Sequence, residues 1–325
     1  MYNIAIIGAG SLGSRHLQGA KLAKIAINLY VVDVNLSSLS LAKERYEEVD
    51  ENEFPKTVTY LDSLDKLPSV LDVVIIATNS AVRSTIILNL IQTRDVRAFL
   101  LEKFLFQSEA EFFEVENALS KNNINCQINC GRRLFAGYKK LKEEISDDGN
   151  IIFNASGSNW GIGCNSIHFI DLFAYLTDSY NVKIDTMSGL SPDILESKRK
   201  GYVEFVGSIT GKNEKGCVLT LTSSLTPSIP VAITIQNKNK SVFIKEESDK
   251  IFIINNGDSK LIKEEKIGIK NQSQLTGIVL EDIISGACGL TSYKESMELH
   301  LTLLRPLLSF YNSSLKLNEI RCPIT

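Results

Sequence analysis

The sequence predicts an α/β protein with two domains: a doubly wound parallel sheet, followed by an α+β domain with a large, mostly antiparallel sheet. Apolar strands alternate with helical segments up to about residue 130, which is the rhythm of a parallel sheet. A glycine-rich turn, G-x-G-x-x-G, joins the first strand to the first helix. Beyond residue 150, strand-like runs with a period of two indicate an antiparallel sheet. A chain of 325 residues is long enough for two such cores.

The first 33 residues predict a strand, a tight turn, a helix and a second strand. Residues 4–7 and 29–32 are apolar runs. Between them, Gly8 permits the tight turn, Gly10 lets backbone N–H groups approach a pyrophosphate, and Gly13 allows close packing of helix on strand. The helix N-terminus then faces the phosphates. We therefore expect a dinucleotide along the backbone of Gly8, Gly10, Ser11, Leu12 and Gly13.

An acidic residue, Asp33, ends the second strand, 20 residues after Gly13. At this position a carboxylate accepts hydrogen bonds from the ribose hydroxyls of NAD and repels the additional phosphate of NADP. The residues that follow, Val34 and Asn35, include no arginine that would bind this phosphate. The pattern favours NAD over NADP.

The β-α rhythm continues through the rest of the first domain. Helices are expected at 36–48, from Asn79 or Ser80 to about residue 90, and at 108–120; strands are expected at 57–61, 72–77, 97–102 and 124–129. Ligands of such sheets bind at the carboxyl ends of the strands. Thr78, Asn79, Glu102 and Lys103 stand at these ends and are therefore candidates for the cofactor cleft.

The second half predicts a different architecture. We expect helices at 135–145, 166–176 and 292–311, the last kinked at Pro306, and strands at 151–155, 202–209, 217–222, 231–236, 241–245 and 251–254. The domains are expected at 1–125 and 126–325, with the terminal helix 292–311 as a candidate to pack back on the first domain. Apolar residues in 242–244 and 251–254 do not keep to one face. A sheet of this kind predicts a homodimer or homotetramer formed through its second face.

Composition excludes several classes of protein. The net charge is −3 with acids and bases interspersed, so neither a nucleic-acid-binding face nor a polybasic membrane segment is expected. An N-terminal strand in place of a signal peptide, and the lack of an apolar run of membrane-spanning length, predict a cytoplasmic protein. Of the six cysteines, Cys126 and Cys130 are close together, but no second pair completes a metal site. We expect free thiols and no metal.

Five short motifs together resemble the Gfo/Idh/MocA family, named after glucose–fructose oxidoreductase and inositol dehydrogenase. They are G-A-G-S-L-G-S-R-H at 8–16, A-T-N-S at 77–80, L-E-K at 101–103, G-R-R at 131–133 and S-I-H-F-I-D-L at 166–172. The motifs follow the family's order, and the α+β region after them has the family's layout. Within the family, residues 101–107, 129–133 and 322–325 are similar to members associated with surface-polysaccharide and sugar biosynthesis.

The resemblance implies an NAD-dependent oxidoreductase that transfers hydride between nicotinamide and a hydroxyl or carbonyl of a sugar, sugar derivative or nucleotide sugar. It implies that Lys103, the lysine of an E-K-P motif with Phe104 in place of proline, lies between nicotinamide and substrate. It also implies that His168 exchanges a proton with the substrate oxygen, a role that suits imidazole near neutral pH. A surface lysine and a packed helix histidine are the structural alternatives.

Four further residues are candidates for the substrate pocket: Asp171, Asn165, Arg133 and Trp160. Asp171, one helical turn after His168, could orient the imidazole or bind a hydroxyl, or could simply be solvated. Arg133 could bind substrate or form an interdomain salt bridge, and Trp160 could stack on a sugar or pack on the protein. Many family members carry an aspartate where this chain has Cys164.

Two other functions remain open at this stage. A non-catalytic, cofactor-binding regulator could keep the glycine turn, although it would have little reason to keep Lys103 and His168 together. NAD-dependent elimination or glycoside cleavage could use the same fold. His16 is expected to pack inside the fold or touch the cofactor edge, and His300 to be structural.

Overall fold

The computed structural model describes residues 1–145, 149–226 and 228–325, with only the backbone at 185–188. The chain divides into two compact units. The first unit comprises Met1–Phe106, Ala110–Gly131 and Lys270–Tyr293, and the second comprises Gln107–Glu109, Arg132–Ile269 and Lys294–Thr325. The first unit thus extends beyond the boundary expected at residue 125, and the segment that returns to it is 270–293. The terminal helix belongs to the second unit from Lys294 onward.

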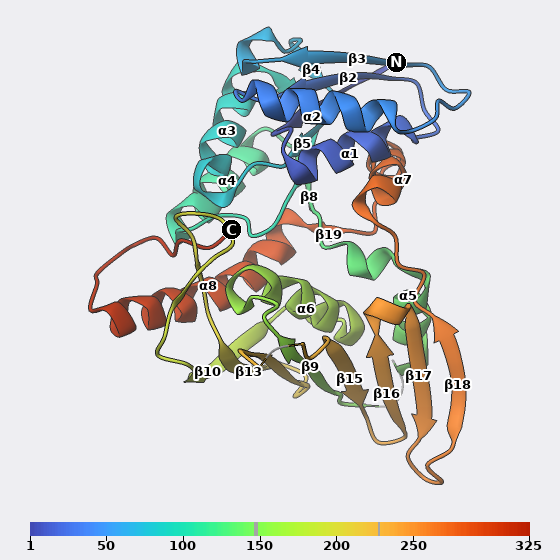
Figure 1. Ribbon diagram of the computed structural model, residues 1–325, viewed down its shortest axis with the longest axis vertical. Helices are drawn as coiled ribbons and strands as arrows, with labels where there is room; N and C mark the ends of the chain where they lie inside the picture. Colours follow the sequence, from blue (N-terminus) through green and yellow to red (C-terminus); the bar gives the residue numbers. More distant parts are fainter. Residues whose placement is uncertain (146–148, 227) are drawn as a thin grey trace. The chain divides into compact units, whose positions relative to one another are not determined.

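The described residues of the first unit form a seven-stranded sheet in the order β19-β8-β7-β5-β1-β2-β3 (Figure 1). Its strands are β1 (Tyr2–Ile7), β2 (Ile27–Val32), β3 (Lys56–Leu61), β5 (Val73–Ile76), β7 (Ala98–Leu101), β8 (Asn125–Ile128) and β19 (Thr291–Ser292). All pairs are parallel except β19 with β8. Two short strands, β4 (Val70–Leu71) and β6 (Asp95–Val96), pair separately. The predicted doubly wound parallel sheet is confirmed.

Helices connect these strands: α1 (Ser11–Lys21), α2 (Leu36–Glu47), α3 (Ser80–Thr93), α4 (Glu109–Lys121) and α7 (Gln272–Ser285). The sequence analysis did not anticipate α7, which packs against α1 within the first unit. Glycines make this contact close, since a Cβ on Gly19 would lie 2.8 Å from Cβ of Thr276, and one on Gly277 would lie 2.7 Å from the Gly19 carbonyl oxygen. Neither position admits a side chain without movement.

The second unit contains an eight-stranded sheet, counted over its described residues, in the order β10-β13-β14-β9-β15-β16-β17-β18. The strands are β9 (Ile152–Ser158), β10 (Val182–Leu190), β13 (Gly207–Asn213), β14 (Val218–Ser224), β15 (Ala232–Gln236), β16 (Lys240–Lys245), β17 (Lys250–Asn255) and β18 (Leu261–Lys266). Only β14 and β9 pair in parallel among these strands. The predicted, mostly antiparallel sheet is therefore confirmed.

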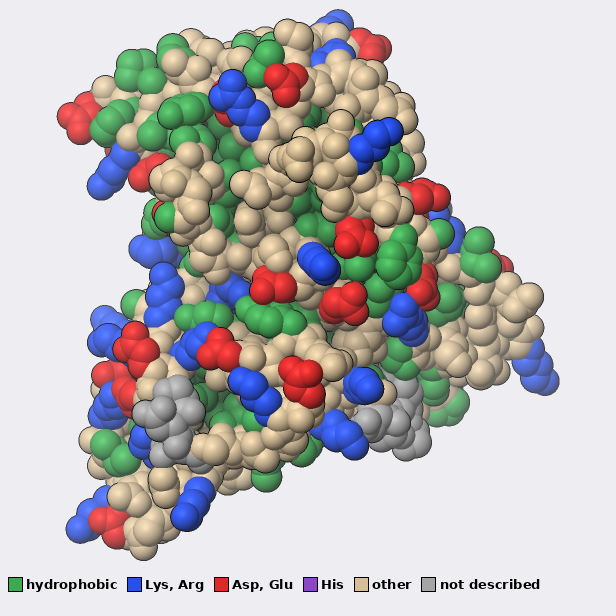
Figure 2. Space-filling model, turned by 180° about the vertical axis from the view of Figure 1, so that it is seen from behind, with side chains coloured by type: hydrophobic (Ala, Val, Ile, Leu, Met, Phe, Trp, Pro, Cys, Tyr) green, Lys and Arg blue, Asp and Glu red, His purple; other side chains and the backbone are tan. Residues whose placement is uncertain are grey.

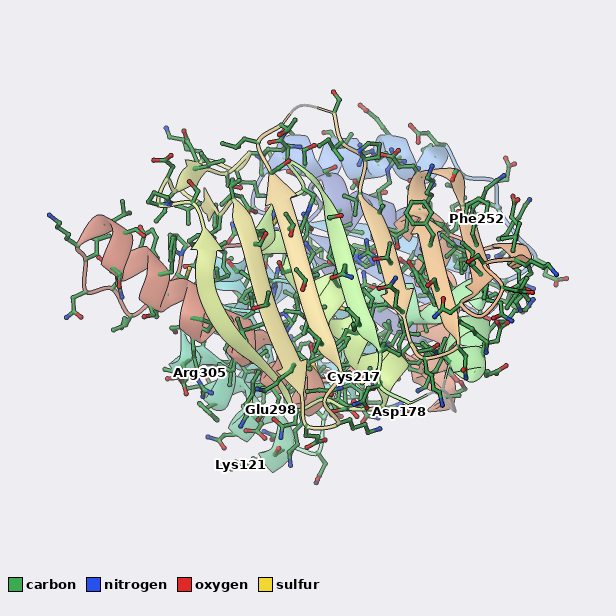
Figure 3. The ribbon with its side chains drawn as sticks, turned by 90° about the horizontal axis from the view of Figure 1, so that it is seen from below. Lys121, Asp178, Cys217, Phe252, Glu298 and Arg305 are labelled. Carbon is green, nitrogen blue, oxygen red and sulfur yellow. The ribbon has the colours of Figure 1, made fainter. Side chains whose placement is uncertain are left out.

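Three helices, α5 (Ala136–Ile145), α6 (Ile162–Thr177) and α8 (Tyr293–Leu315), accompany this sheet, and α6 packs on β14. Alternation separates the two faces of the sheet: Val242, Ile244 and Ile251 are buried, whereas Phe243 and Phe252 are half-exposed on the opposite face. Figure 3 shows that face, with Phe252 labelled. Phe243 and Phe252 are direct partners in the register of β16 and β17.

Several elements differ from the sequence-based expectations. Helix α6 begins at Ile162, not at 166, because the Glu204 carboxylate accepts hydrogen bonds from the amides of Gly163 and Cys164. The strand expected at 202–209 is β13, which runs from 207 to 213, preceded by the short β12 (Val203–Glu204), which pairs with β11 (Leu195–Glu196). Strands β10 and β18 were not expected, and α8 continues through Pro306.

Three further observations concern the helices, the possible metal ligands and the cysteines. In the described ranges, no helix is both long and apolar enough to span a membrane, and no cluster of three or more His, Cys, Asp or Glu residues could hold a metal ion. None of the six cysteines forms a disulfide bond, and burial raises the pKa of Cys126. On the face seen in Figure 2, acidic and basic side chains are interspersed.

Candidate functional site

The glycine turn after β1 has the geometry that close backbone packing requires. Gly8 has a positive φ of 94°, a conformation that favours glycine. A Cβ on Gly13 would lie 1.7 Å from the Gly8 carbonyl oxygen, so Gly13 must lack a side chain. By contrast, beyond its chain neighbours no atom of the described residues lies within 4 Å of a Cβ built on Gly10. Gly8 and Gly13 therefore serve the fold, whereas Gly10 leaves space for a ligand.

The N-terminus of α1 follows this turn directly, with Gly10 as the N-cap residue. Ser11, Leu12 and Gly13 form the first turn of the helix, whose N–H groups have no intrahelical acceptor. Such a helix end attracts anions through its dipole and its orphan donors. The predicted phosphate-binding residues are thus assembled at one helix end.

Asp33 lies at the end of β2, against the glycine turn. One carboxylate oxygen accepts a hydrogen bond from the Ala9 backbone N–H at 2.7 Å, and the other accepts from the Asn35 N–H at 2.9 Å. Each oxygen retains acceptor capacity for a further donor. The carboxylate is half-buried and held in place. It can therefore accept bonds from a pair of vicinal hydroxyls, and its charge opposes a phosphate at the same position.

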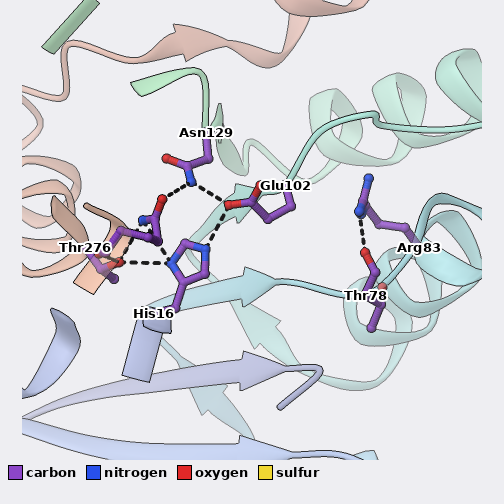
Figure 4. Close-up of polar contacts among 7 residues, drawn as sticks. His16, Thr78, Arg83, Glu102, Asn129 and Thr276 are labelled. Carbon is purple, nitrogen blue, oxygen red and sulfur yellow. Dashed lines mark hydrogen bonds and ion pairs between the residues drawn. The ribbon is translucent and has the colours of Figure 1, made fainter. Parts of the chain in front are cut away.

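Glu102, at the end of β7, lies in a buried polar network rather than in open space (Figure 4). Its Oε1 contacts His16 Nε2 at 2.9 Å and accepts a hydrogen bond from the Asn129 amide. The network continues from His16 to the Thr276 hydroxyl at 3.0 Å and from Asn129 to Gln272 at 2.8 Å. Glu102 thereby joins β7 to α1, β8 and α7.

The charge of Glu102 is stabilised by these contacts. Burial by itself would raise the pKa of the Glu102 carboxyl, but the hydrogen bond and charge of His16 hold that pKa below its usual range. Glu102 is 4% exposed, so its carboxylate is committed to the protein interior. His16 is fully buried, the first of the two positions expected for it.

Lys103 follows Glu102 and is half-buried, whereas Phe104, Leu105 and Phe106 after it are fully buried. The peptide bond between Lys103 and Phe104 is cis. At the neighbouring end of β5, Thr78 is half-buried and Asn79 caps α3, its Oδ1 accepting a hydrogen bond from the Ala81 N–H. Thr78, Asn79, Glu102 and Lys103 all stand at the carboxyl ends of strands, as expected.

Sequence analysis missed Arg83, which is 1% exposed in α3. The sequence pattern could have predicted a buried arginine here. The buried residues of α3 follow helical spacing and include one arginine: Ser80, Arg83, Ser84, Ile87 and Leu90. A charged residue within an apolar stripe indicates a specific buried partner.

In the second unit, Arg133 and Asp171 bind one another. The guanidinium donates to both carboxylate oxygens, at 3.0 Å from Nε and 2.9 Å from Nη2, and to the Tyr180 hydroxyl at 3.1 Å. The side chains of Arg133 and Asp171 are 4% and 1% exposed. Burial alone would lower the pKa of Arg133, but the charge of Asp171 raises it above its usual value. Arg133 thus forms a salt bridge within the second unit, rather than the interdomain salt bridge that the sequence left open, and this pair fixes residue 133 to α6.

His168 is half-buried on α6, one turn before Asp171. The Asn165 amide donates to the Trp160 carbonyl, and the Trp160 ring N–H donates to the Thr222 carbonyl at 2.8 Å. The Trp160 ring packs edge-on against Phe169, with ring centres 5.2 Å apart. These contacts hold Trp160 against the protein, between β14 and α6.

The amino end of α6 carries a second feature that the sequence did not reveal. Glu204 accepts hydrogen bonds from the Gly163 N–H at 2.8 Å and the Cys164 N–H at 3.2 Å. A Cβ on Gly161 would lie 2.8 Å from Oε1 of Glu204, so the glycine leaves space for this carboxylate. The residue before Asn165 is a cysteine, but the carboxylate of Glu204, which belongs to β12, lies beside it.

The structure thus brings together the glycine turn with Asp33, Glu102 with His16, Arg133 with Asp171, and Asn165 with Trp160. Lys103 belongs to the first unit and His168 to the second.

Comparison with known proteins places this architecture among solved structures. No protein-family model matches the chain, and no curated protein matches its sequence. An oxidoreductase from Agrobacterium radiobacter in complex with NAD⁺, L-tartaric acid and magnesium is similar, with a TM-score of 0.72 at 12% identity over 96% of this chain and 97% of that one.

UDP-N-acetylglucosamine 3-dehydrogenase GnnA from Acidithiobacillus ferrooxidans gives a TM-score of 0.69 at 13% identity, covering 94% and 96% of the two chains. A super-repressor mutant of Gal80p from Saccharomyces cerevisiae gives 0.69 at 14% identity, covering 97% and 96%. At these identities the likeness establishes the fold: the chain has, nearly end to end, the architecture that these oxidoreductases and Gal80p share.

Proposed function

We propose that this chain is an NAD-dependent oxidoreductase of the Gfo/Idh/MocA family. It would transfer hydride between nicotinamide and a carbon bearing a hydroxyl or carbonyl group in a sugar, sugar derivative or nucleotide sugar. The observation that carries the proposal is the Asp33 carboxylate, held 2.7 Å from the Ala9 N–H on a glycine turn that opens a helix. This arrangement suits a dinucleotide with an unmodified ribose.

The residues divide the work as follows. The backbone of Gly10, Ser11 and Leu12 binds the pyrophosphate, and Asp33 binds the adenine-side ribose. Bound NAD supplies the carbon that accepts or donates hydride. Lys103 donates a hydrogen bond to the reacting substrate oxygen, and His168 takes the hydroxyl proton during oxidation and returns it during reduction.

The buried groups serve positioning in this proposal. Glu102 is part of the network with His16 and Asn129, so it fixes the residue that precedes Lys103. Asp171 and Arg133 fix the helix that carries His168, because the guanidinium of Arg133 donates hydrogen bonds to both carboxylate oxygens of Asp171. Asn165 and Trp160 shape the segment that precedes His168 on the same unit. A cytoplasmic role in sugar or polysaccharide biosynthesis accords with this chemistry.

The test is a panel of free sugars, sugar derivatives and nucleotide sugars, each offered with NAD and with NADP while NADH or NADPH absorbance is followed. We expect turnover with NAD on at least one class. Mass spectrometry of the product should show loss of two hydrogens. Loss of water or of an aglycone would instead indicate elimination or glycoside cleavage.

A non-catalytic regulator is the second candidate, and the likeness to Gal80p over 97% of this chain favours it. Such a protein would bind NAD as tightly as an NAD-dependent enzyme does, but it would catalyse no reaction. Calorimetric NAD binding combined with an inactive panel would support the regulator and contradict the enzyme.

We also propose a homodimer or homotetramer in which the open face of the large sheet meets a second copy. This face carries a row in register across three strands: Thr234, Phe243 and Phe252. Ile152 and Val218 add side chains that are 49% and 39% exposed. A sheet face with half-exposed aromatic and β-branched side chains is suited to a partner sheet.

Light scattering at micromolar concentration should give at least twice the chain mass of 36.0 kDa. Phe252→Lys, at the β17 end of this row, should shift the mass toward the monomer, because a charge would then lie in the interface. Lys66→Ala, at a surface position of the first unit, is the control. A monomeric wild-type protein would refute this part of the proposal.

A further inference from the structure

Arg83 is among the largest fully buried side chains of the described residues, yet it carries a charge. It lies in the first full turn of α3, on the helix face that also buries Ser80, Ser84 and Ile87. An ionised group is retained in such a place when specific acceptors stabilise it. Here backbone carbonyls of two different turns accept hydrogen bonds from Nη1 and Nη2 of the guanidinium.

The guanidinium joins these turns directly. Its Nη2 donates to the Thr78 carbonyl, in the turn after β5 (Figure 4). Its Nη1 donates to the carbonyls of Phe104 and, at 2.9 Å, Leu105, in the turn after β7. A guanidinium is planar and presents its donors as a rigid fork, so one side chain fixes the separation of the two turns.

The second turn begins at Lys103, which is fixed from both sides. Before it, the Glu102 carboxylate is held by His16 and Asn129. After it, the Phe104 and Leu105 carbonyls are held by Arg83. The backbone at Lys103 therefore lies between two buried anchors on different elements. Thr78 at the end of β5 is connected to the same arginine.

We propose that Arg83 is a positioning residue, which sets where the Lys103 amine stands relative to the turn that carries Thr78. The inference rests on the proposed oxidoreductase function, in which the amine must meet the substrate oxygen. A misplacement of about 1 Å can cost roughly a hundredfold in rate. Arg83 would act entirely through the backbone that it holds.

The experiment compares Arg83→Lys, Arg83→Ala and the surface control Arg97→Met, whose side chain is 64% exposed. A lysine keeps the charge but lacks the fork, so we expect kcat to fall roughly tenfold to a hundredfold while KM for NAD stays within a few-fold. Added guanidinium should restore part of the turnover of Arg83→Ala. Arg97→Met should match the wild type in both measurements.

Amide hydrogen exchange supplies a readout that does not depend on activity. In Arg83→Lys, exchange should rise together in peptides covering 77–80 and 103–107 and remain unchanged in β1. Wild-type turnover in Arg83→Lys, absence of guanidinium rescue, or a uniform rise in exchange would overturn the inference. If the wild type is inactive on the whole panel, the proposed function fails, and the paired rise in exchange still decides whether Arg83 couples the two turns.

Discussion

The glycine turn of the first unit and the Arg133–Asp171 pair of the second are built in different ways. In the first unit, the turn at 8–13 presents mainly backbone N–H groups to a ligand. Its geometry requires glycine at positions where a Cβ would collide with the backbone. In the second unit, the buried centre consists of side chains, because Arg133, Asp171 and Tyr180 satisfy one another. A backbone site depends on glycine and on chain direction, whereas a side-chain site depends on complete pairing. Substitutions should therefore have different consequences in the two units.

We expect the largest effect on turnover from variants that remove the proposed reactive group of either unit. His168→Ala should lower turnover by about a hundredfold to ten-thousandfold, because proton transfer by a positioned group contributes that much. Lys103→Ala should lower turnover by about a hundredfold to a thousandfold, because it removes a hydrogen bond to the reacting oxygen. NAD affinity, measured by fluorescence titration, should remain within a few-fold, since neither residue belongs to the glycine turn. Cys164→Ala is the matched control on α6 and should have a small effect. Near-normal turnover in the histidine variant would contradict the assigned chemistry.

The next effect tests complete pairing in the second unit. Arg133→Met leaves the Asp171 carboxylate, which is 1% exposed, without its guanidinium and should reduce the free energy of unfolding by about 3–5 kcal/mol. The double variant Arg133→Met with Asp171→Leu should regain much of this loss. Urea denaturation provides the measurement. Arg97→Met, at the exposed Arg97–Asp72 pair, should cost less than about 1 kcal/mol.

Two glycines sharpen the comparison in the first unit. Gly13→Ala would place a Cβ 1.7 Å from the Gly8 carbonyl oxygen, so the turn must shift, with an expected cost of about 1–3 kcal/mol of stability. Gly10→Ala meets no such obstacle within the described residues and should keep the melting temperature while weakening NAD binding. Equal melting temperatures for the two variants would show that the turn does not limit packing as described.

The smallest effect concerns the choice of cofactor. Asp33→Asn keeps an oxygen that can accept from the Ala9 N–H but removes the charge. Discrimination against NADP should therefore fall by about tenfold, or roughly 1.4 kcal/mol. Titration of both cofactors measures it. Tighter binding of NADP than of NAD by the wild type would contradict the assignment of Asp33.

The difference between the units also explains what the sequence could predict. The glycine turn, Asp33 and the alternating strands follow from local spacing, so the parallel sheet and the position of Asp33 beside the glycine turn could be predicted from residues that are near in sequence. Arg83 and Glu204 could not, because their acceptors and donors lie in other elements. The partners of Arg133 and Trp160, Asp171 and Thr222, could not be predicted either, because spacing alone does not select them.

The contact between α1 and α7 has a consequence for the order in which the chain matures. His16 and Thr276 are hydrogen-bonded although 260 positions separate them. During synthesis, α1 leaves the ribosome long before α7 exists, and the whole large sheet of the second unit is made in the interval. The first unit can complete the buried network around Glu102 only after residues 272–276 emerge. The first unit therefore stays incomplete until most of the second has been made, and a chain truncated before α7 would leave Gly19 and His16 without their α7 contacts.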